Sequence, residues 1–245
     1  MATSSELERP AFYALRPGGW RDLVTLLHPP YTAWHLSYVA IGAAIAPRLD
    51  AGRLAWTLVA FLLAVGVAAH ALDELHGRPL TTHLSGRTLT FLAATSLVGA
   101  GAIGVVGARS ISPWLLAFVA VGVLLVAAYN LELAGGRLHN GATFALAWGA
   151  FPALTAYFAQ AVELSAQALL VAAACTALSV VQRRLSTPVR ELRRRTVAVS
   201  GEQRMADGRT IALDSARIAA PMEGALRACS AAMVLLAFGL VAARL

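Results

Sequence analysis

Five ionisable side chains lie within nine residues at the end of a long apolar segment. They belong to the stretch HALDELHGR and are His70, Asp73, Glu74, His76 and Arg78. On a helix, side chains three or four residues apart share a face, so two carboxylates and two imidazoles would meet in nearly one region. A carboxylate at membrane depth needs a partner, and Mg²⁺ typically takes one or two carboxylates together with phosphate oxygens and water. The stretch therefore predicts either a magnesium and phosphate site or a plain interfacial helix end with a His–Glu pair.

A second polar cluster, Tyr129, Asn130 and Glu132, ends another apolar segment. Tyrosine is also frequent in the aromatic belt at the membrane interface, so a binding role and an interfacial role both stay open for Tyr129. Asn140 is a predicted N-cap of the next helix, and His139 before it is expected to be a solvated loop histidine.

The composition sets the fold class. Hydrophobic residues make up 58% and charged residues 13% of the 245 residues, and the mean hydropathy is +0.65, whereas soluble domains are about half apolar and one quarter charged. A membrane-spanning helix needs about 20 apolar residues, and seven segments approach that length. They cover residues 31–47, 54–72, 88–108, 113–132, 141–160, 164–182 and 219–243. We therefore predict an all-α, polytopic integral membrane bundle of about seven transmembrane helices.

Polar segments flank and interrupt these helices. Residues 1–30 are expected to form a cytoplasmic N-terminal segment, and residues 31–245 a transmembrane domain with a cytoplasmic loop at 183–218. Within that loop, residues 189–197 predict a short amphipathic helix. It would lie on the membrane surface or cover the site.

The net charge of +7 comes from 20 arginines and no lysine. In a membrane protein such an excess sets topology and contacts anionic lipid, so we expect membrane lipids as partners and no nucleic acid. With seven spans, fifteen arginines lie on the side of the N-terminus and four on the other side. This asymmetry predicts a cytoplasmic N-terminus and a C-terminus outside. The same topology places all six histidines at or near the cytoplasmic face, where we expect the chemistry.

Four stretches resemble motifs of the UbiA superfamily of intramembrane prenyltransferases. LHPPYTAW (27–34) resembles the entry to the first helix of the family, with His28 where arginine is usual. DELHGRPLTTHLSGRTL (73–89) is similar to the stretch after its second helix. AYNLELAGGRLHNGATFALAWGAFPALTAYFA (128–159) resembles the end of the fourth helix and the glycine-rich fifth, and ADGRTIAL (206–213) the element after the second Asp-rich motif. Together these stretches extend over most of the chain.

The resemblance implies an enzyme that binds an isoprenoid diphosphate, or another lipid substrate, with Mg²⁺ at the cytoplasmic mouth of the bundle. Prenyl transfer to an acceptor and cyclisation of the chain are both compatible with it. It implies catalytic roles for His70, Asp73, Glu74 and His76, with Asp73 and Glu74 also as Mg²⁺ ligands. The residues implied to bind the substrate are Arg78, Arg87, Tyr129, Asn130, Arg183 and Arg184.

The chain departs from the family pattern in its acidic motifs. Of the first motif only Asp73 and Glu74 are acidic, and the second is replaced by VVQRRLSTPVRELRRR (180–195), whose single acid is Glu191. Ionising an allylic diphosphate requires the charge on the leaving pyrophosphate to be neutralised, commonly by two or more Mg²⁺. Guanidinium groups that pair with phosphate could do so instead.

Two other functions are compatible with the sequence. The first is a non-catalytic UbiA-like membrane protein that binds isoprenoid lipid or acts as an assembly partner. The second is a membrane di-iron oxygenase, whose sites use HxxxH or HxxHH pairs. The separation of six residues between His70 and His76 does not place them on neighbouring helix positions, which disfavours the second.

Overall fold

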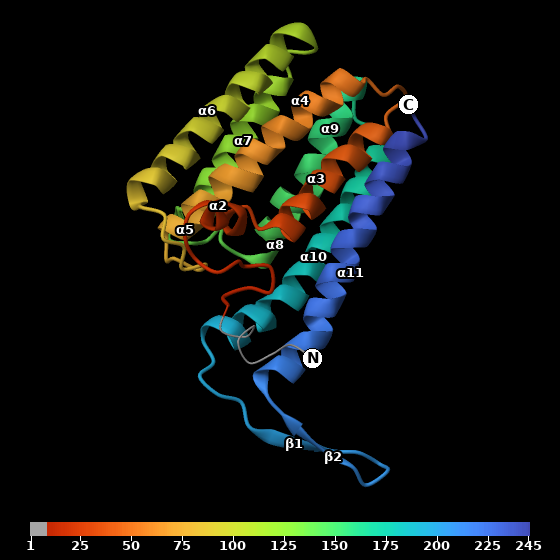
Figure 1. Ribbon diagram of the computed structural model, residues 1–245. Coiled ribbons are helices and arrows are strands. Elements are labelled where there is room, and N and C mark those ends of the chain that lie inside the picture. Colours follow the sequence, from red (N-terminus) through yellow and green to blue (C-terminus); the bar gives the residue numbers. More distant parts are fainter. Residues whose placement is uncertain (1–8) are drawn as a thin grey trace.

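The computed structural model describes residues 9–245 as a bundle of long helices that run side by side (Figure 1). The helices are α2 (Trp20–Leu26), α3 (Pro29–Ala44), α4 (Ala51–Phe61), α5 (His70–Leu75), α6 (Gly86–Ser110), α7 (Leu115–Asn130), α8 (Gly141–Ala145), α9 (Phe151–Ala161), α10 (Ala166–Arg194) and α11 (Ser215–Ala242). Two π-helical segments, η1 (Leu62–Ala69) and η2 (Leu146–Ala150), join α4 to α5 and α8 to α9. An antiparallel hairpin of β1 (Gly201–Arg204) and β2 (Thr210–Leu213) connects α10 to α11.

Five of the described helices are long and apolar enough to cross a membrane. They are Ala51–Leu75, Gly86–Ser110, Gly141–Ala161, Ala166–Arg194 and Ser215–Ala242. Each of the seven apolar segments of the sequence coincides with a helix, and the remaining two, α3 and α7, have 16 residues each. The prediction of an all-α bundle of membrane-spanning type is therefore confirmed.

Helix α3 lies at the centre of the bundle, between α9 and α11. Trp34 and Tyr38 on this helix are fully buried, and the Trp34 indole donates to the Tyr38 hydroxyl. A Cβ at Gly42 would lie 2.2 Å from the carbonyl oxygen of Ala153, so only glycine lets α3 approach α9 this closely. In lipid, where helices gain little from the hydrophobic effect, such close contact is a main source of packing energy.

The two π-helical segments place histidine partners at one end of the bundle. A π-turn holds an extra residue and often occurs at functional sites. The Gly66 carbonyl in η1 accepts a hydrogen bond from His70 Nδ1 at 3.0 Å, and the Trp148 carbonyl in η2 accepts one from His35 Nδ1 at 3.0 Å. Both wide turns therefore orient an imidazole ring.

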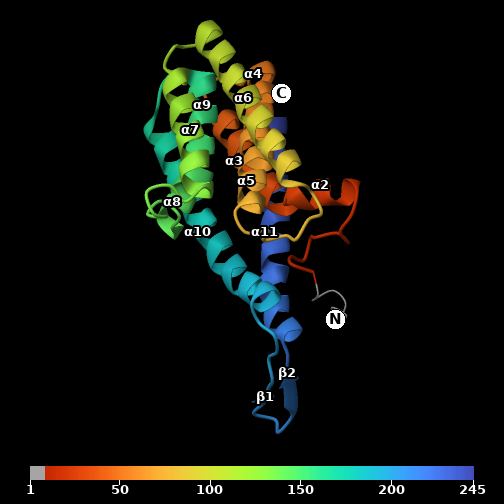
Figure 2. The same cartoon turned by 90° about the vertical axis from the view of Figure 1, so that its left-hand side faces the viewer.

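The structure corrects the boundary of the loop predicted at 183–218. Helix α10 continues through Arg194, so the predicted helix at 189–197 is largely its last turns, and the hairpin and the start of α11 occupy most of the rest. Hydropathy falls at Arg183, but the helix continues because its polar turns pack against α11. There Arg193 and Glu223 form a bidentate ion pair in which both side chains are almost fully buried. Figures 1 and 2 show both helices extending beyond the rest of the bundle to the hairpin.

The C-terminus lies at the opposite end of the bundle from the hairpin (Figure 1). There Arg244 donates to the carbonyl oxygens of Ala46 and Pro47 at 2.9 and 2.7 Å. Arg53 caps the end of α9 at the same level through the carbonyls of Ala159 and Gln160, each at 3.2 Å. These bonds satisfy carbonyl groups that helix ends leave open.

Candidate functional site

A polar cavity of 420 Å³ lies at the end of the bundle from which the hairpin extends. Its walls come from α3, α5, α7 and α10 and from residues 10–13, which precede α2. Five of the six histidines of the chain line this one cavity. They are His28, His35, His70, His76 and His139.

His28 and His70 form one wall as a stacked pair. Their ring centroids are 4.1 Å apart and their planes differ by 15°. His28 has a left-handed backbone (φ 46°), and its Nδ1 shares a 2.7 Å hydrogen bond with the Tyr13 hydroxyl. Within residues 9–245 its Nε2 is buried and has no hydrogen-bond partner. Burial, and then the nearby His70, Arg194 and Arg190, hold the pKa of His28 well below its ordinary value, so the ring is neutral at pH 7.

Backbone carbonyls fix the tautomers of three other rings. His35, His70 and His139 each direct Nδ1 at a carbonyl oxygen 3.0 Å away. A carbonyl only accepts, so in the neutral ring Nδ1 carries the proton and Nε2 is left as an acceptor. The acceptor carbonyls belong to Trp148, Gly66 and Tyr129.

Helix α10 forms the facing wall with three half-buried arginines, at positions 183, 190 and 194. Their spacing of seven and four residues puts them on one helix face. Arg183 donates to the Tyr129 hydroxyl at 2.6 Å and lies 5.3 Å over the Phe144 ring. Arg190 donates to the Thr187 hydroxyl at 3.2 Å, and Arg194 to the Pro10 carbonyl at 3.0 Å.

The acids that line the cavity balance this charge only in part. Asp73 on α5 is half-buried, whereas Glu132 and Glu191 are exposed. Glu132 lies at the rim between His76 and His139, with oxygens 3.7 Å and 3.9 Å from their ring nitrogens. The interior of the cavity therefore presents three guanidinium groups and one carboxylate.

The predicted site residues divide into two groups. Those that line the cavity are His70, Asp73, His76, Tyr129, Asn130 and Arg183. Those that do not line it are Glu74, Arg78, Arg87 and Arg184. Arg87 and Arg184 are exposed, and Arg78 donates to the carbonyl of Leu84 at 2.6 Å within its own loop.

Glu74 is fully buried and holds the connection between α5 and α6. Its Oε2 accepts from the Leu80 amide, and its Oε1 accepts from both the amide and the hydroxyl of Thr82, each at 2.9 Å. The two carboxylates that the resemblance implies as a Mg²⁺ pair thus have different surroundings. Only Asp73 faces the cavity.

The site also contains residues that the sequence analysis did not name individually as site residues. Arg190 and Arg194 line the cavity, and so does Gln182, whose amide nitrogen and oxygen are both buried without a partner among the described residues. His28, His35 and the exposed Arg195 also belong to this set. The spacing of the arginines was a usable signal, but it indicates one face only if the helix extends beyond residue 182.

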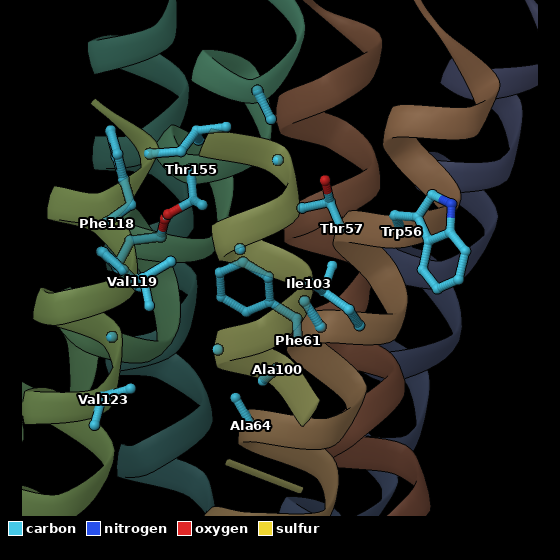
Figure 3. A pocket seen from close by; sticks show the side chains of 18 of the residues that line it. Trp56, Thr57, Phe61, Ala64, Ala100, Ile103, Phe118, Val119, Val123 and Thr155 are labelled. Carbon is cyan, nitrogen blue, oxygen red and sulfur yellow. The ribbon is translucent and has the colours of Figure 1, made fainter. Parts of the chain in front are cut away.

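An apolar cavity of 690 Å³ lies farther from the hairpin, between α4, α6, α7 and α9. Figure 3 shows Val119 and Val123 of α7 and Thr57 of α4 on opposite sides of it, with Ala100 and Ile103 of α6 between them. Its α6 wall runs from Leu97 to Ser110, which is about 20 Å at the rise of an α-helix.

Trp148 lines both cavities. Its indole packs against two rings, that of Tyr129 with centroids 4.7 Å apart and that of Phe144 with centroids 5.6 Å apart and nearly parallel planes. The carbonyl of the same residue orients His35. The polar and apolar cavities therefore meet at one aromatic residue of η2.

Comparison with protein-family models, with curated proteins and with solved structures finds no match for this chain. Among residues 9–245, no three His, Cys, Asp or Glu side chains are grouped so that they could hold a metal ion. The donor set on the cavity thus does not fit the pair of acidic ligands that the resemblance implies, because Glu74 is used by its own loop.

Proposed function

We propose that the chain is a UbiA-like intramembrane protein that binds an isoprenoid diphosphate. The diphosphate occupies the polar cavity and the isoprenoid chain occupies the apolar cavity. The observation that carries this proposal is the pair of cavities of opposite character that share Trp148. An amphipathic lipid with a compact anionic headgroup matches both parts.

The charge of the polar cavity supports an anionic headgroup. Three half-buried guanidiniums face a single half-buried carboxylate, and charge left unpaired near a membrane interior is costly. Guanidinium pairs with phosphate oxygens through two parallel hydrogen bonds. A diphosphate would therefore satisfy groups that the protein itself leaves short of negative charge.

The proposed reaction is departure of the diphosphate with transfer of the prenyl group to an acceptor, or with cyclisation of the chain. His70, Asp73 and His76 line the polar cavity and are the proposed catalytic residues. In its neutral form the His70 ring, with Nδ1 bonded to the Gly66 carbonyl, offers Nε2 as a proton acceptor.

The second candidate function is a non-catalytic protein that binds isoprenoid lipid or acts in an assembly. The position of Glu74 favours it, because this carboxylate holds a loop instead of facing the cavity. Release of pyrophosphate from geranylgeranyl diphosphate, with and without added acceptors, distinguishes the two. Binding without any release supports the non-catalytic protein.

The proposed function also includes an orientation of the chain in the membrane. The polar cavity faces the cytoplasm, with the hairpin on the same side and the C-terminus outside, because arginine is concentrated at the cavity end. A single cysteine introduced in the hairpin at Asp207 and one at Leu245 should react with a membrane-impermeant thiol reagent from opposite sides. Labelling of both from the outside would contradict the orientation.

Binding is the first test of the proposed function. Purified protein in nanodiscs should bind geranylgeranyl diphosphate more tightly than either geranylgeraniol, which lacks the charge, or inorganic pyrophosphate, which lacks the chain. The affinity for geranylgeraniol and for pyrophosphate should be lower because each of these two probes fills one cavity only. Equal affinity for all three probes, or no affinity for the diphosphate, would rule out the two-cavity site.

A further inference from the structure

The groups around the polar cavity are poor ligands for a divalent cation. Asp73 is the one half-buried acid there, and both oxygens of its neighbour Glu74 accept hydrogen bonds elsewhere. The stacked rings of His28 and His70 have nearly parallel planes and centroids 4.1 Å apart. Their in-plane lone pairs therefore run side by side and cannot converge on one ion.

The same cavity is well suited to hold a diphosphate by guanidinium groups alone. The last turns of α10 present Arg190 and Arg194, about one helical turn apart, and Arg183 lies two turns before Arg190 on the same face. These arginines supply the fixed positive charge that a diphosphate needs.

Each arginine is also held in place by a neighbour before any ligand binds. Arg183 is fixed by the Tyr129 hydroxyl and the Phe144 ring. Arg194 uses Nε for the Pro10 carbonyl, which leaves its two Nη groups for a ligand. A preorganised donor set loses less side-chain entropy on binding.

We propose that this site binds its diphosphate directly through Arg183, Arg190 and Arg194, without a divalent cation. The inference rests on the proposed function and specifies how the headgroup is recognised. Buried polar groups without a partner in the described residues, the Gln182 amide and His28 Nε2, line the same space and offer additional hydrogen bonds to the headgroup.

The test measures binding of geranylgeranyl diphosphate to the full chain in nanodiscs, once with a chelator and once with excess Mg²⁺. The two dissociation constants should agree within a factor of two or so. The variants Arg190→Gln and Arg194→Gln should each weaken binding about tenfold or more, as expected for loss of one charge-assisted contact. Asp73→Asn should bind at least as tightly as the wild type, because it removes a negative charge from the cavity.

The control is Arg217→Gln, which removes an exposed arginine of α11 outside the cavity and should leave affinity unchanged. Because Arg194 also holds the Pro10 carbonyl, Arg194→Lys and the melting temperatures of all variants separate lost binding from lost folding. Lysine keeps the charge but not the bidentate geometry, so intermediate affinity is expected.

Two results would contradict the metal-independent site and the proposed function separately. Binding that requires Mg²⁺ and disappears in Asp73→Asn would overturn the metal-independent site and leave the proposed function intact. No binding by the wild type in either condition would overturn the proposed function itself.

Discussion

Arg183 donates a hydrogen bond to the Tyr129 hydroxyl at 2.6 Å and thereby joins α10 to α7 across the polar cavity. The Tyr129 ring stacks on His139 with centroids 4.4 Å apart. The same tyrosine lies against Trp148, where the two cavities meet. Tyr129 is therefore placed to position the arginine and lies beside the residue that lines both cavities.

Replacing Tyr129 by Phe should weaken binding of geranylgeranyl diphosphate about tenfold, equivalent to about 1.4 kcal/mol, because Arg183 is no longer held in place and loses more side-chain freedom on binding. The phenyl ring keeps the stacking, so the melting temperature should change little. Tyr157→Phe, at a buried tyrosine in the cluster with Ala46 and Ala168, is the matched control. Calorimetric titration checks the result, and equal affinity of the two variants would contradict a positioning role.

Glu74→Gln should destabilise the fold. The carboxylate accepts three hydrogen bonds in a fully buried position, and the new amide group would turn an N–H toward a backbone N–H. A loss of about 1–3 kcal/mol is expected, because a buried donor is left without an acceptor. Thermal unfolding in detergent measures the change.

Asp73→Asn is the control for that prediction, since it makes the same chemical change one residue earlier at a half-buried position on the cavity. It should retain the melting temperature of the wild type. If the two variants unfold at the same temperature, Glu74 does not have the structural role inferred from its contacts.

The sequence was sufficient to predict the helices and the end of the bundle that carries the polar groups. Hydropathy located each apolar segment, because transmembrane length is a strong constraint. The histidine distribution was equally informative, and five of them line one cavity. Of adjacent Asp73 and Glu74, however, periodicity alone could not tell which faces the cavity, because that depends on how the loop at 80–82 folds back onto Glu74.

The arginines show a second limit of prediction from the sequence. Arg183 and Arg184 are neighbours in the sequence, but only Arg183 lines the cavity, while Arg184 on the other side of the helix is exposed. Arg190 and Arg194 were not singled out within the arginine-rich stretch 180–195, because a hydropathy criterion ended the helix at residue 182. A helix whose last turns are stabilised by polar contacts has no hydropathy signal. In α10 the polar contact is that of Arg193 with Glu223, thirty residues later in the sequence.

The pair of Arg193 and Glu223 should contribute strongly to the stability of the extended ends of α10 and α11. The side chains are only 2% and 7% exposed, and Arg193 Nη2 lies 3.0 Å from Glu223 Oε2. Removing one partner of a buried pair costs about 3–5 kcal/mol, because the other charge is left behind. Glu223→Gln should therefore lower the melting temperature clearly.

The double variant Arg193→Met with Glu223→Met tests the origin of that loss. Replacing both charges by apolar groups is often neutral, so the double variant should be more stable than Glu223→Gln. If it is less stable, the desolvated charge is not the cause.

His28 should make the fold sensitive to mild acid. Burial, and then His70, Arg194 and Arg190, lower its pKa in the folded chain below the ordinary 6.5. The unfolded chain therefore takes up the proton first as the pH falls, and stability decreases below about pH 6.5. Above that pH the His28 ring is neutral in both states and contributes no pH dependence.

Asn at position 28 removes the titrating group and tolerates the left-handed backbone (φ 46°) better than most residues do. The melting temperature of His28→Asn should fall less between about pH 7.5 and about pH 5 than that of the wild type. These two pH values lie on either side of the ordinary histidine pKa of about 6.5. If the melting temperatures of the two proteins fall equally with pH, His28 is not the cause of the sensitivity to acid.

Gly101 should determine how long an isoprenoid chain the apolar cavity accepts. It lies on the α6 wall of the cavity, and a Cβ built there meets no atom within 4 Å, so a large side chain can enter the cavity without disturbing the helices. Gly101→Phe should weaken binding of geranylgeranyl diphosphate about tenfold, equivalent to about 1.4 kcal/mol, while the shorter geranyl diphosphate keeps its affinity. Gly239→Phe adds the same ring to an exposed glycine of α11 that is equally open, and it should change neither affinity. A Gly101→Phe variant that binds both diphosphates as the wild type does would contradict the placement of the chain along this wall of the cavity.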